Sequence, residues 1–169
     1  MNETIYYDSP VGLLRIKNEG DALSEIIFIK TEDQAEIKKL KKSITKPTTP
    51  ILKKCTAQLD DYFSGKNLQF DLPIVQEGTP FQQRVWKGLL TIPKGKTLSY
   101  LQFSKQLGNE KAIRAVGTAN GKNNVSIIVP CHRVIGSNGM LVGYGGGLWR
   151  KQWLLNHEAK YCNGVQTMF

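Results

Sequence analysis

The first third of the chain alternates apolar and polar positions in the way that half-buried strands do. Three segments rich in β-branched and aromatic residues are separated by turn sequences around positions 9–10 and 18–20. We therefore expect strands over residues 4–8, 11–17 and 22–30.

Apolar residues then recur at helical spacing over residues 32–43 and 50–64. The second stripe ends at Gly65 and comprises Leu52, Cys55, Leu59 and Tyr62 or Phe63. Cys55 is expected to be a small buried residue of that stripe. The lysine run within 38–42 has acidic residues close by in sequence, so it predicts a solvated helix face.

A proline- and glycine-containing stretch over residues 71–80 is typical of a linker between two domains. Thr79 and Pro80 then have the order expected for the cap and first residue of a helix. This helix is expected to end near Ile92-Pro93.

Residues 99–121 have the pattern of a helix-turn-helix. Ser99 is expected to cap a short helix, Gly108 permits a tight turn, and Asn109 is expected to cap a second helix. In that second helix we expect Ile113 and Val116 to point inward. The basic residues Lys111 and Arg114 are expected to point outward. Its small residues fit either close approach to another surface or close helix packing.

The charge of the 169 residues is +9 overall and is unevenly distributed. Residues 1–78 carry −1, whereas residues 79–169 carry +10 with Glu110 and Glu158 as their only acids. This asymmetry favours a polyanionic partner, most simply nucleic acid, over a merely basic soluble surface. No apolar run approaches the ~20 residues of a membrane span, and the amino terminus does not resemble a secretory signal.

Cysteine and histidine usage further limits the possible chemistry. The three cysteines cannot all pair within one chain, and their spacing matches no metal or redox motif. A reducing cytoplasm is therefore the expected location. With two histidines in the chain, we expect no histidine-rich metal site. Cys55 has no histidine or cysteine nearby in sequence, so no metal is expected.

A buried strand is expected over residues 126–129, and it leads into Cys131-His132. A thiol beside an imidazole is a plausible nucleophile and base. An inert buried cysteine beside a solvent-facing histidine is the alternative. Glu158, on a helix expected to end at 156–158, is the candidate partner of His132, and a salt bridge at the helix end is the other interpretation.

Several motifs together resemble the methylated-DNA–protein-cysteine methyltransferases, the O6-alkylguanine-DNA alkyltransferases. The motifs are the PCHRV sequence that begins at Pro130, Asn123 before it, the glycine-rich stretch 143–148 and the sequence WLLNHE over 153–158. The resemblance is close over residues 79–160 and weaker toward the amino terminus.

The resemblance implies an α+β protein with two domains. Residues 1–78 are expected to form a ribonuclease-H-like α/β domain without that enzyme's catalysis. Residues 79–169 are expected to form a mostly helical winged helix-turn-helix domain that carries out alkyl transfer.

The resemblance also implies a repair reaction in which the damaged nucleotide is flipped out of duplex DNA. The lesion is O6-alkylguanine, and O4-alkylthymine is a further expected substrate. Cys131 would take the alkyl group irreversibly and once per molecule, with no cofactor. The implied catalytic residues are Cys131, His132 as the base acting through water, Glu158 as its orienting group, Asn123, and Tyr100 as a proton donor.

Contacts with the substrate follow from the same resemblance. The implied DNA contacts are Tyr100, Leu101, Asn109, Arg114 as an intercalating finger, and Ser137. The implied base pocket comprises Val134, Tyr144 and Gly145. The expected partner is double-stranded DNA bound by a monomer, with no membrane involved.

Two alternatives remain from the sequence. A non-catalytic protein that binds alkyl lesions would share the fold, but such proteins lack the cysteine. A helix-turn-helix transcription factor would read base sequence in the major groove and give Cys131 no role.

Overall fold

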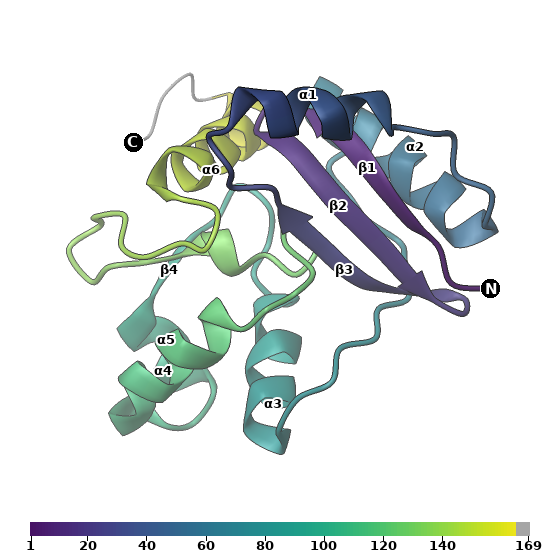
Figure 1. The fold of residues 1–169 in the computed structure, drawn as a ribbon. Helices are drawn as coiled ribbons and strands as arrows, with labels where there is room; N and C mark the ends of the chain where they lie inside the picture. Colours follow the sequence, from purple (N-terminus) through teal and green to yellow (C-terminus); the bar gives the residue numbers. More distant parts are fainter. Residues whose placement is uncertain (165–169) are drawn as a thin grey trace. The chain divides into compact units, whose positions relative to one another are not determined.

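The computed structural model describes residues 1–164 (Figure 1). These residues form two compact units. The first unit comprises Met1–Gln76 together with Asn124–Ser126. The second comprises Glu77–Asn123 and the chain from Ile127 onward. Of the helices within the described part of the chain, none is long and apolar enough to cross a membrane.

The first unit is built on an antiparallel sheet in the order β1-β2-β3. Its strands are β1 (Thr4–Ser9), β2 (Gly12–Glu19) and β3 (Ala22–Phe28), as the alternating pattern predicts. Gly12 has a φ of 97°, a conformation that favours glycine, at the turn between β1 and β2.

Two helices accompany this sheet, α1 (Gln34–Lys42) and α2 (Pro50–Ser64). The buried face of α2 is the predicted stripe, and α2 packs against β2 and β3. Cys55 is fully buried in it, and burial raises the pKa of its thiol to about 12. No residue of α1 is buried, so its lysine run is a solvated face, as predicted.

The segment predicted as a linker is partly integrated into the first unit. Leu23 of β3 donates from its backbone N–H to the carbonyl of Pro73 at 2.8 Å and accepts from the N–H of Val75 at 2.8 Å. The edge of β3 thus satisfies backbone groups that a free linker would expose to water.

Glu3, directly before β1, forms hydrogen bonds with the two residues that precede α2. Its carboxylate accepts backbone N–H bonds from Thr48 and Thr49 and hydroxyl bonds from the same two residues. The Thr49 N–H bond is the main cause that lowers the pKa of Glu3 from 4.5 to about 2. These bonds satisfy N–H groups at a helix start that have no helical partner.

Glu3 therefore predicts an acid-dependent loss of stability. Because its folded pKa is depressed, its contribution is present above 4.5 and is lost as the pH falls toward about 2. We expect Glu3→Gln to lower the stability at neutral pH and to flatten the decline between roughly pH 5 and pH 3. Urea unfolding across that range measures both; parallel curves for the two proteins would contradict the assignment.

The second unit contains four helices and a short parallel sheet among the described residues. The helices are α3 (Pro80–Leu89), α4 (Tyr100–Gln106), α5 (Ile113–Gly121) and α6 (Leu148–Asn163). The sheet pairs β4 (Leu98–Ser99) with β5 (Val134–Ile135), and single helical turns η1 (Glu110–Ala112) and η2 (Cys131–Arg133) precede α5 and β5.

Helix α3 supports the helix-turn-helix formed by α4 and α5. Thr79 and Ser99 cap α3 and α4 as predicted, each in a capping box with a glutamine three residues later. Helix α3 packs against α5, and the buried Trp86 indole donates to the Ala119 carbonyl at 2.9 Å. This bond fixes the carboxyl end of α5.

Two details of the second helix differ from the prediction. Asn109 precedes η1, but its side chain makes no capping hydrogen bond. Val116 is buried as predicted, whereas Ile113, the first residue of α5, is exposed.

The predicted strand over 126–129 is wrong: the segment is a buried turn. Val125 pairs with Ile26 of β3, and then Ile127 turns the chain with a φ of 74°. A left-handed β-branched residue is strained, at a cost of about 1–3 kcal/mol. A fully apolar run has no periodicity that separates a strand from such a turn.

The last helix is longer than predicted. It continues past 156–158 to Asn163 and ends at Gly164 with a φ of 70°. Glu158 therefore lies inside the helix, and the interpretation of a salt bridge at the helix end is wrong.

Candidate active site

Cys131 begins the single turn η2, directly after the buried turn. Only 6% of the residue is exposed. The side-chain amide of Asn123 donates to the Cys131 Sγ at 3.4 Å and to the Val129 carbonyl at 2.9 Å. Asn123 thus fixes both the thiol and the chain that leads to it, and two predicted site residues lie in contact.

The environment of Cys131 has opposing effects on its thiol. Burial raises the pKa of Cys131, and it outweighs the hydrogen bond from Asn123, the charge of Lys151 and the hydroxyl of Tyr144, which lower it. The resting group is therefore a thiol, and formation of the nucleophilic thiolate needs a base.

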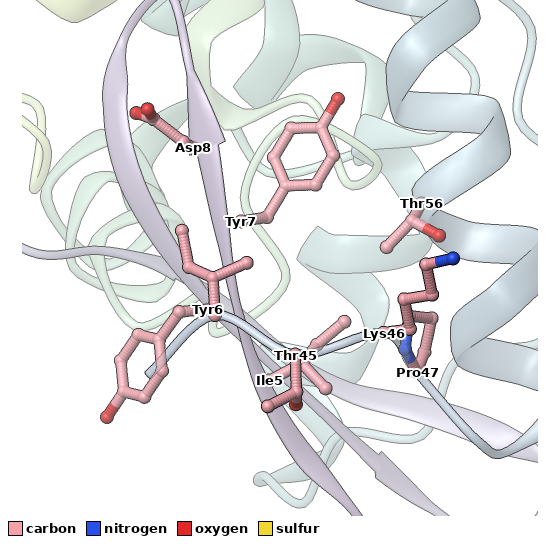
Figure 2. Close-up of a pocket in the computed structure, with 9 residues that line it drawn as sticks. Ile5, Tyr6, Tyr7, Asp8, Thr45, Lys46, Pro47 and Thr56 are labelled. Carbon is pink, nitrogen blue, oxygen red and sulfur yellow. The ribbon is translucent and has the colours of Figure 1, made fainter. Parts of the chain in front are cut away.

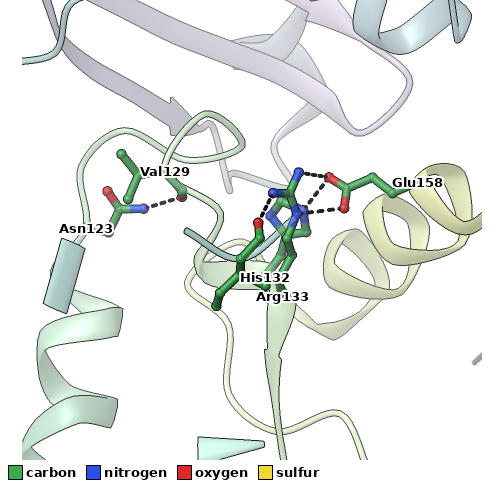
Figure 3. A network of polar contacts seen from close by, with 6 residues as sticks. Asn123, Val129, His132, Arg133 and Glu158 are labelled. Carbon is green, nitrogen blue, oxygen red and sulfur yellow. Dashed lines mark hydrogen bonds and ion pairs between the residues drawn. The ribbon is translucent and has the colours of Figure 1, made fainter. Parts of the chain in front are cut away.

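His132 and Glu158 form a buried pair that can supply this base (Figure 3). His132 Nε2 lies 2.8 Å from Glu158 Oε1. Because burial lowers the pKa of His132, the imidazole is neutral, and because a carboxylate only accepts hydrogen bonds, Nε2 is its protonated nitrogen. His132 Nδ1 then holds a lone pair, and it is buried without a hydrogen-bond partner in the described part of the protein.

Arg133 completes this network and was not foreseen as a site residue. Its guanidinium donates to both oxygens of Glu158, each at 2.9 Å, and to the Ile92 carbonyl at 2.7 Å. Burial raises the pKa of Glu158, but the opposing effects of His132 and Arg133 hold it well below the usual range. Arginine is permanently charged, so Arg133 keeps Glu158 ionised while His132 is neutral.

Lys151 is a second buried cation that the sequence analysis missed. It is fully buried, and its ammonium donates to the carbonyls of Val134 at 2.7 Å and Val142 at 2.8 Å. Burial lowers its pKa to about 8, opposed by the charge of Cys131. A signal was present: Lys151 shares the buried stripe of α6 with Leu154 and Glu158, where a charged residue requires buried partners.

Tyr100, the first residue of α4, lies at the same site. Its hydroxyl accepts a hydrogen bond from the Asn120 side-chain amide at 3.2 Å, and the same nitrogen donates to the Cys131 carbonyl at 3.3 Å. Burial raises the pKa of Tyr100, whereas the Asn120 hydrogen bond lowers it. Asn120 is a third residue that the sequence analysis did not single out.

The residues expected to contact DNA are not part of this buried cluster, apart from Tyr100. Asn109, Arg114 and Ser137 are exposed, and Leu101 is half-buried. Exposure leaves the polar side chains of Asn109, Arg114 and Ser137 accessible to a ligand.

The residues expected to line a base pocket lie in different environments. Val134 is fully buried, directly after η2. Tyr144 is half-buried, and its side chain lowers the pKa of Cys131. Gly145 is exposed, and a Cβ added there would meet no atom within 4 Å.

The first unit has a separate hollow of about 360 Å³ beside β1 (Figure 2). Its lining is mainly apolar, with Asp8 and Lys46 as the charged side chains. None of the predicted site residues lines this hollow. Among residues 1–164, no group of three or more histidine, cysteine, aspartate or glutamate side chains could hold a metal ion.

Two family models together match most of the chain. The 6-O-methylguanine DNA methyltransferase ribonuclease-like domain matches residues 4–76, and the DNA binding domain of the same family matches residues 80–160. The chain belongs to the 6-O-methylguanine DNA methyltransferase family. The resemblance inferred from the sequence is confirmed, as is the predicted fold class of a ribonuclease-like domain followed by a DNA-binding domain.

Individual relatives are similar over nearly their whole length. A methylated-DNA–protein-cysteine methyltransferase of Mycobacterium tuberculosis is 42% identical over 96% of this chain and 95% of its own length. A constitutive methylated-DNA–protein-cysteine methyltransferase of Bacillus subtilis is 42% identical over 94% of this chain and 96% of its own length. A crystal structure of Mycobacterium tuberculosis OGT in complex with DNA has a TM-score of 0.80 and 42% identity, covering 94% of this chain and 93% of that one.

Proposed function

We propose that this protein repairs duplex DNA by transferring the alkyl group of O6-alkylguanine, and of O4-alkylthymine, to its own Cys131. One observation carries this proposal: a buried thiol held by Asn123 is followed directly by a neutral histidine whose Nε2 is fixed on Glu158. This is the order of nucleophile, base and orienting group that activates a weak nucleophile.

The proposed transfer is a single displacement. The thiol proton passes through a water to His132 Nδ1, and the thiolate forms an S–C bond as the bond between the alkyl carbon and the base oxygen breaks. The electron pair of the broken bond stays on the base, which takes a proton from Tyr100. The imidazolium returns its proton through solvent to the tyrosinate, so the thiol proton replaces the alkyl group on the base.

Access to the lesion requires that the nucleotide leave the base stack, because its O6 substituent is unreachable within the duplex. We propose that α5 lies in the minor groove, where its small residues permit close approach, and that Arg114 fills the vacated stack. Asn109, Ser137 and Leu101 contact the DNA around it. The charge of +10 over residues 79–169 supports binding to a polyanion.

The flipped base is proposed to lie against Val134, Tyr144 and Gly145. The open space beside Gly145 supports a pocket that also accommodates larger alkyl groups. The product is a thioether that no neighbouring group can cleave, so each molecule acts once and without a cofactor.

We assign residues 1–78 to the ribonuclease-H-like domain and residues 79–169 to the alkyltransferase domain. We propose that the protein acts as a monomer in the cytoplasm. The three cysteines are free thiols, which a reducing compartment preserves.

Stoichiometry tests this function. A duplex with one O6-methylguanine is supplied in molar excess, and restored guanine is counted per protein molecule. We expect one restored base per molecule and then no further reaction. Continued turnover would overturn the single-use mechanism, and binding of the lesion with no restored guanine would identify a non-catalytic lesion-binding protein instead.

Arg114→Ala is expected to slow repair of the duplex by roughly 10- to 100-fold, because extrusion of a stacked base costs a few kcal/mol that the inserted side chain offsets. Single-turnover rates on saturating duplex measure the effect. Lys111→Ala is the matched control, since it removes another exposed cation of the same region and should weaken binding only. A native repair rate in Arg114→Ala would rule out the finger role.

A further inference from the structure

Asn120 connects two groups of the proposed reaction. It lies in the last turn of α5 and is 5% exposed. Its Nδ2 lies 3.2 Å from the Tyr100 hydroxyl and 3.3 Å from the Cys131 carbonyl. One side-chain nitrogen thus joins Tyr100, the proposed acid, to the main chain of Cys131, the proposed nucleophile.

The chemistry of these partners fixes the orientation of the amide. A backbone carbonyl only accepts hydrogen bonds, so the end of Asn120 that faces Cys131 is the amino end. This nitrogen carries two hydrogens, one for the carbonyl and one for Tyr100. The Tyr100 oxygen is therefore an acceptor toward Asn120, and its own hydrogen points elsewhere.

The other end of the amide is unfavourable for folding. Asn120 Oδ1 is buried and has no hydrogen-bond partner among residues 1–164. A buried acceptor without a partner destabilises a fold. An apolar side chain of similar size should therefore fold at least as well, which separates a role in the reaction from a role in stability.

We propose that Asn120 is a positioning residue that directs the Tyr100 O–H toward the departing base and ties it to the Cys131 main chain. The proposal rests on the proposed function, because it concerns the proton that the base receives. The hydrogen bond from Asn120 also lowers the pKa of Tyr100 against the effect of burial, which makes the phenol a better acid. Cys131 is the other titratable group that acts on Tyr100, and it raises this pKa.

A comparison of two leaving groups tests this role. Guanine needs a proton as it leaves, whereas iodide, displaced from iodoacetamide by the same thiol, needs none. We expect Asn120→Leu to slow methyl transfer from an O6-methylguanine duplex by about 10- to 100-fold, a part of what a general acid contributes. Its rate with iodoacetamide, followed on the peptide that contains Cys131, its affinity for the duplex and its Tm should not fall.

A double-mutant cycle with Tyr100→Phe shows whether Asn120 acts through the tyrosine. In the Tyr100→Phe protein, Asn120→Leu should cause no further loss. Asn67→Leu, a change at an exposed asparagine of the first unit, is the control for the substitution itself and should react at the native rate.

The outcomes separate this proposal from the proposed function. If the native protein accepts no methyl group, the function fails. If the native protein reacts and Asn120→Leu reacts equally fast, the positioning role is wrong. The positioning role is also wrong if Asn120→Leu slows the reaction with iodoacetamide to the same extent, since Asn120 would then act on Cys131. It is likewise wrong if the rate losses caused by Asn120→Leu and Tyr100→Phe are fully additive.

Discussion

Cys131→Ala is expected to abolish alkyl transfer while duplex binding stays within about two-fold of the native affinity, because the change removes the proposed nucleophile and no exposed charge. The sulfur accepts a hydrogen bond from Asn123, but the carbonyls of Val129 and Cys131 that bind Asn123 and Asn120 remain. Single-turnover assays on an O6-methylguanine duplex and a binding titration measure the two properties separately.

The other cysteines serve as controls for this substitution. Cys162 is exposed on the last turn of α6, and Cys162→Ser should transfer at the native rate. Residual transfer by Cys131→Ala would mean that another thiol is the acceptor. Loss of duplex binding in Cys131→Ala would mean that the residue also maintains the DNA-binding surface.

Glu158→Ala is expected to have the largest effect on stability, a loss of about 3–5 kcal/mol, because it leaves a buried arginine without its partner. Arg133 donates two of its hydrogen bonds to this carboxylate, which is 1% exposed. The same change removes the acceptor that fixes the His132 tautomer, so transfer should slow as well. Urea unfolding at neutral pH measures the loss.

Glu110→Ala provides the matched control, since Glu110 is the only other acid among residues 79–169 and is exposed. It should change the stability by less than about 0.5 kcal/mol.

The contribution of Glu158 to stability should also depend on pH. Because the folded pKa of Glu158 is depressed, this contribution is present above its unfolded value of 4.5 and is lost as the pH falls below that value. Equal stability of Glu158→Ala and the native protein would contradict the buried network.

The elements that could be predicted from the sequence are those with a local signal. The alternation of apolar and polar residues predicts β1 to β3, and the cap residues Thr79 and Ser99 predict the starts of α3 and α4. The buried turn over 126–129 had no such signal. Its first residue, Ser126, donates its backbone N–H to the carbonyl of Ile26 in β3, about a hundred residues earlier in the chain, and a contact so distant in sequence leaves no local pattern.

The site was predicted in part for a similar reason. The sequence motifs indicated Cys131, His132 and Glu158, and the structure brings the last two together at 2.8 Å. Arg133, Lys151 and Asn120 were missed because their importance arises from burial and from carbonyl partners distant in sequence. Ile92, which binds Arg133, lies 41 positions before it. Lys151 had a local signal in its position on the stripe of Leu154, but for Arg133 and Asn120 only the folded chain shows that the polar groups are enclosed.

Peptide mapping by mass spectrometry after reaction with a methylated duplex tests most directly whether the Cys131 sulfur accepts the alkyl group. We predict one added methyl group, on the peptide that contains Cys131, with the peptides of Cys55 and Cys162 unchanged. A methyl group on either of those peptides, or an unmodified protein beside restored guanine, would contradict this account.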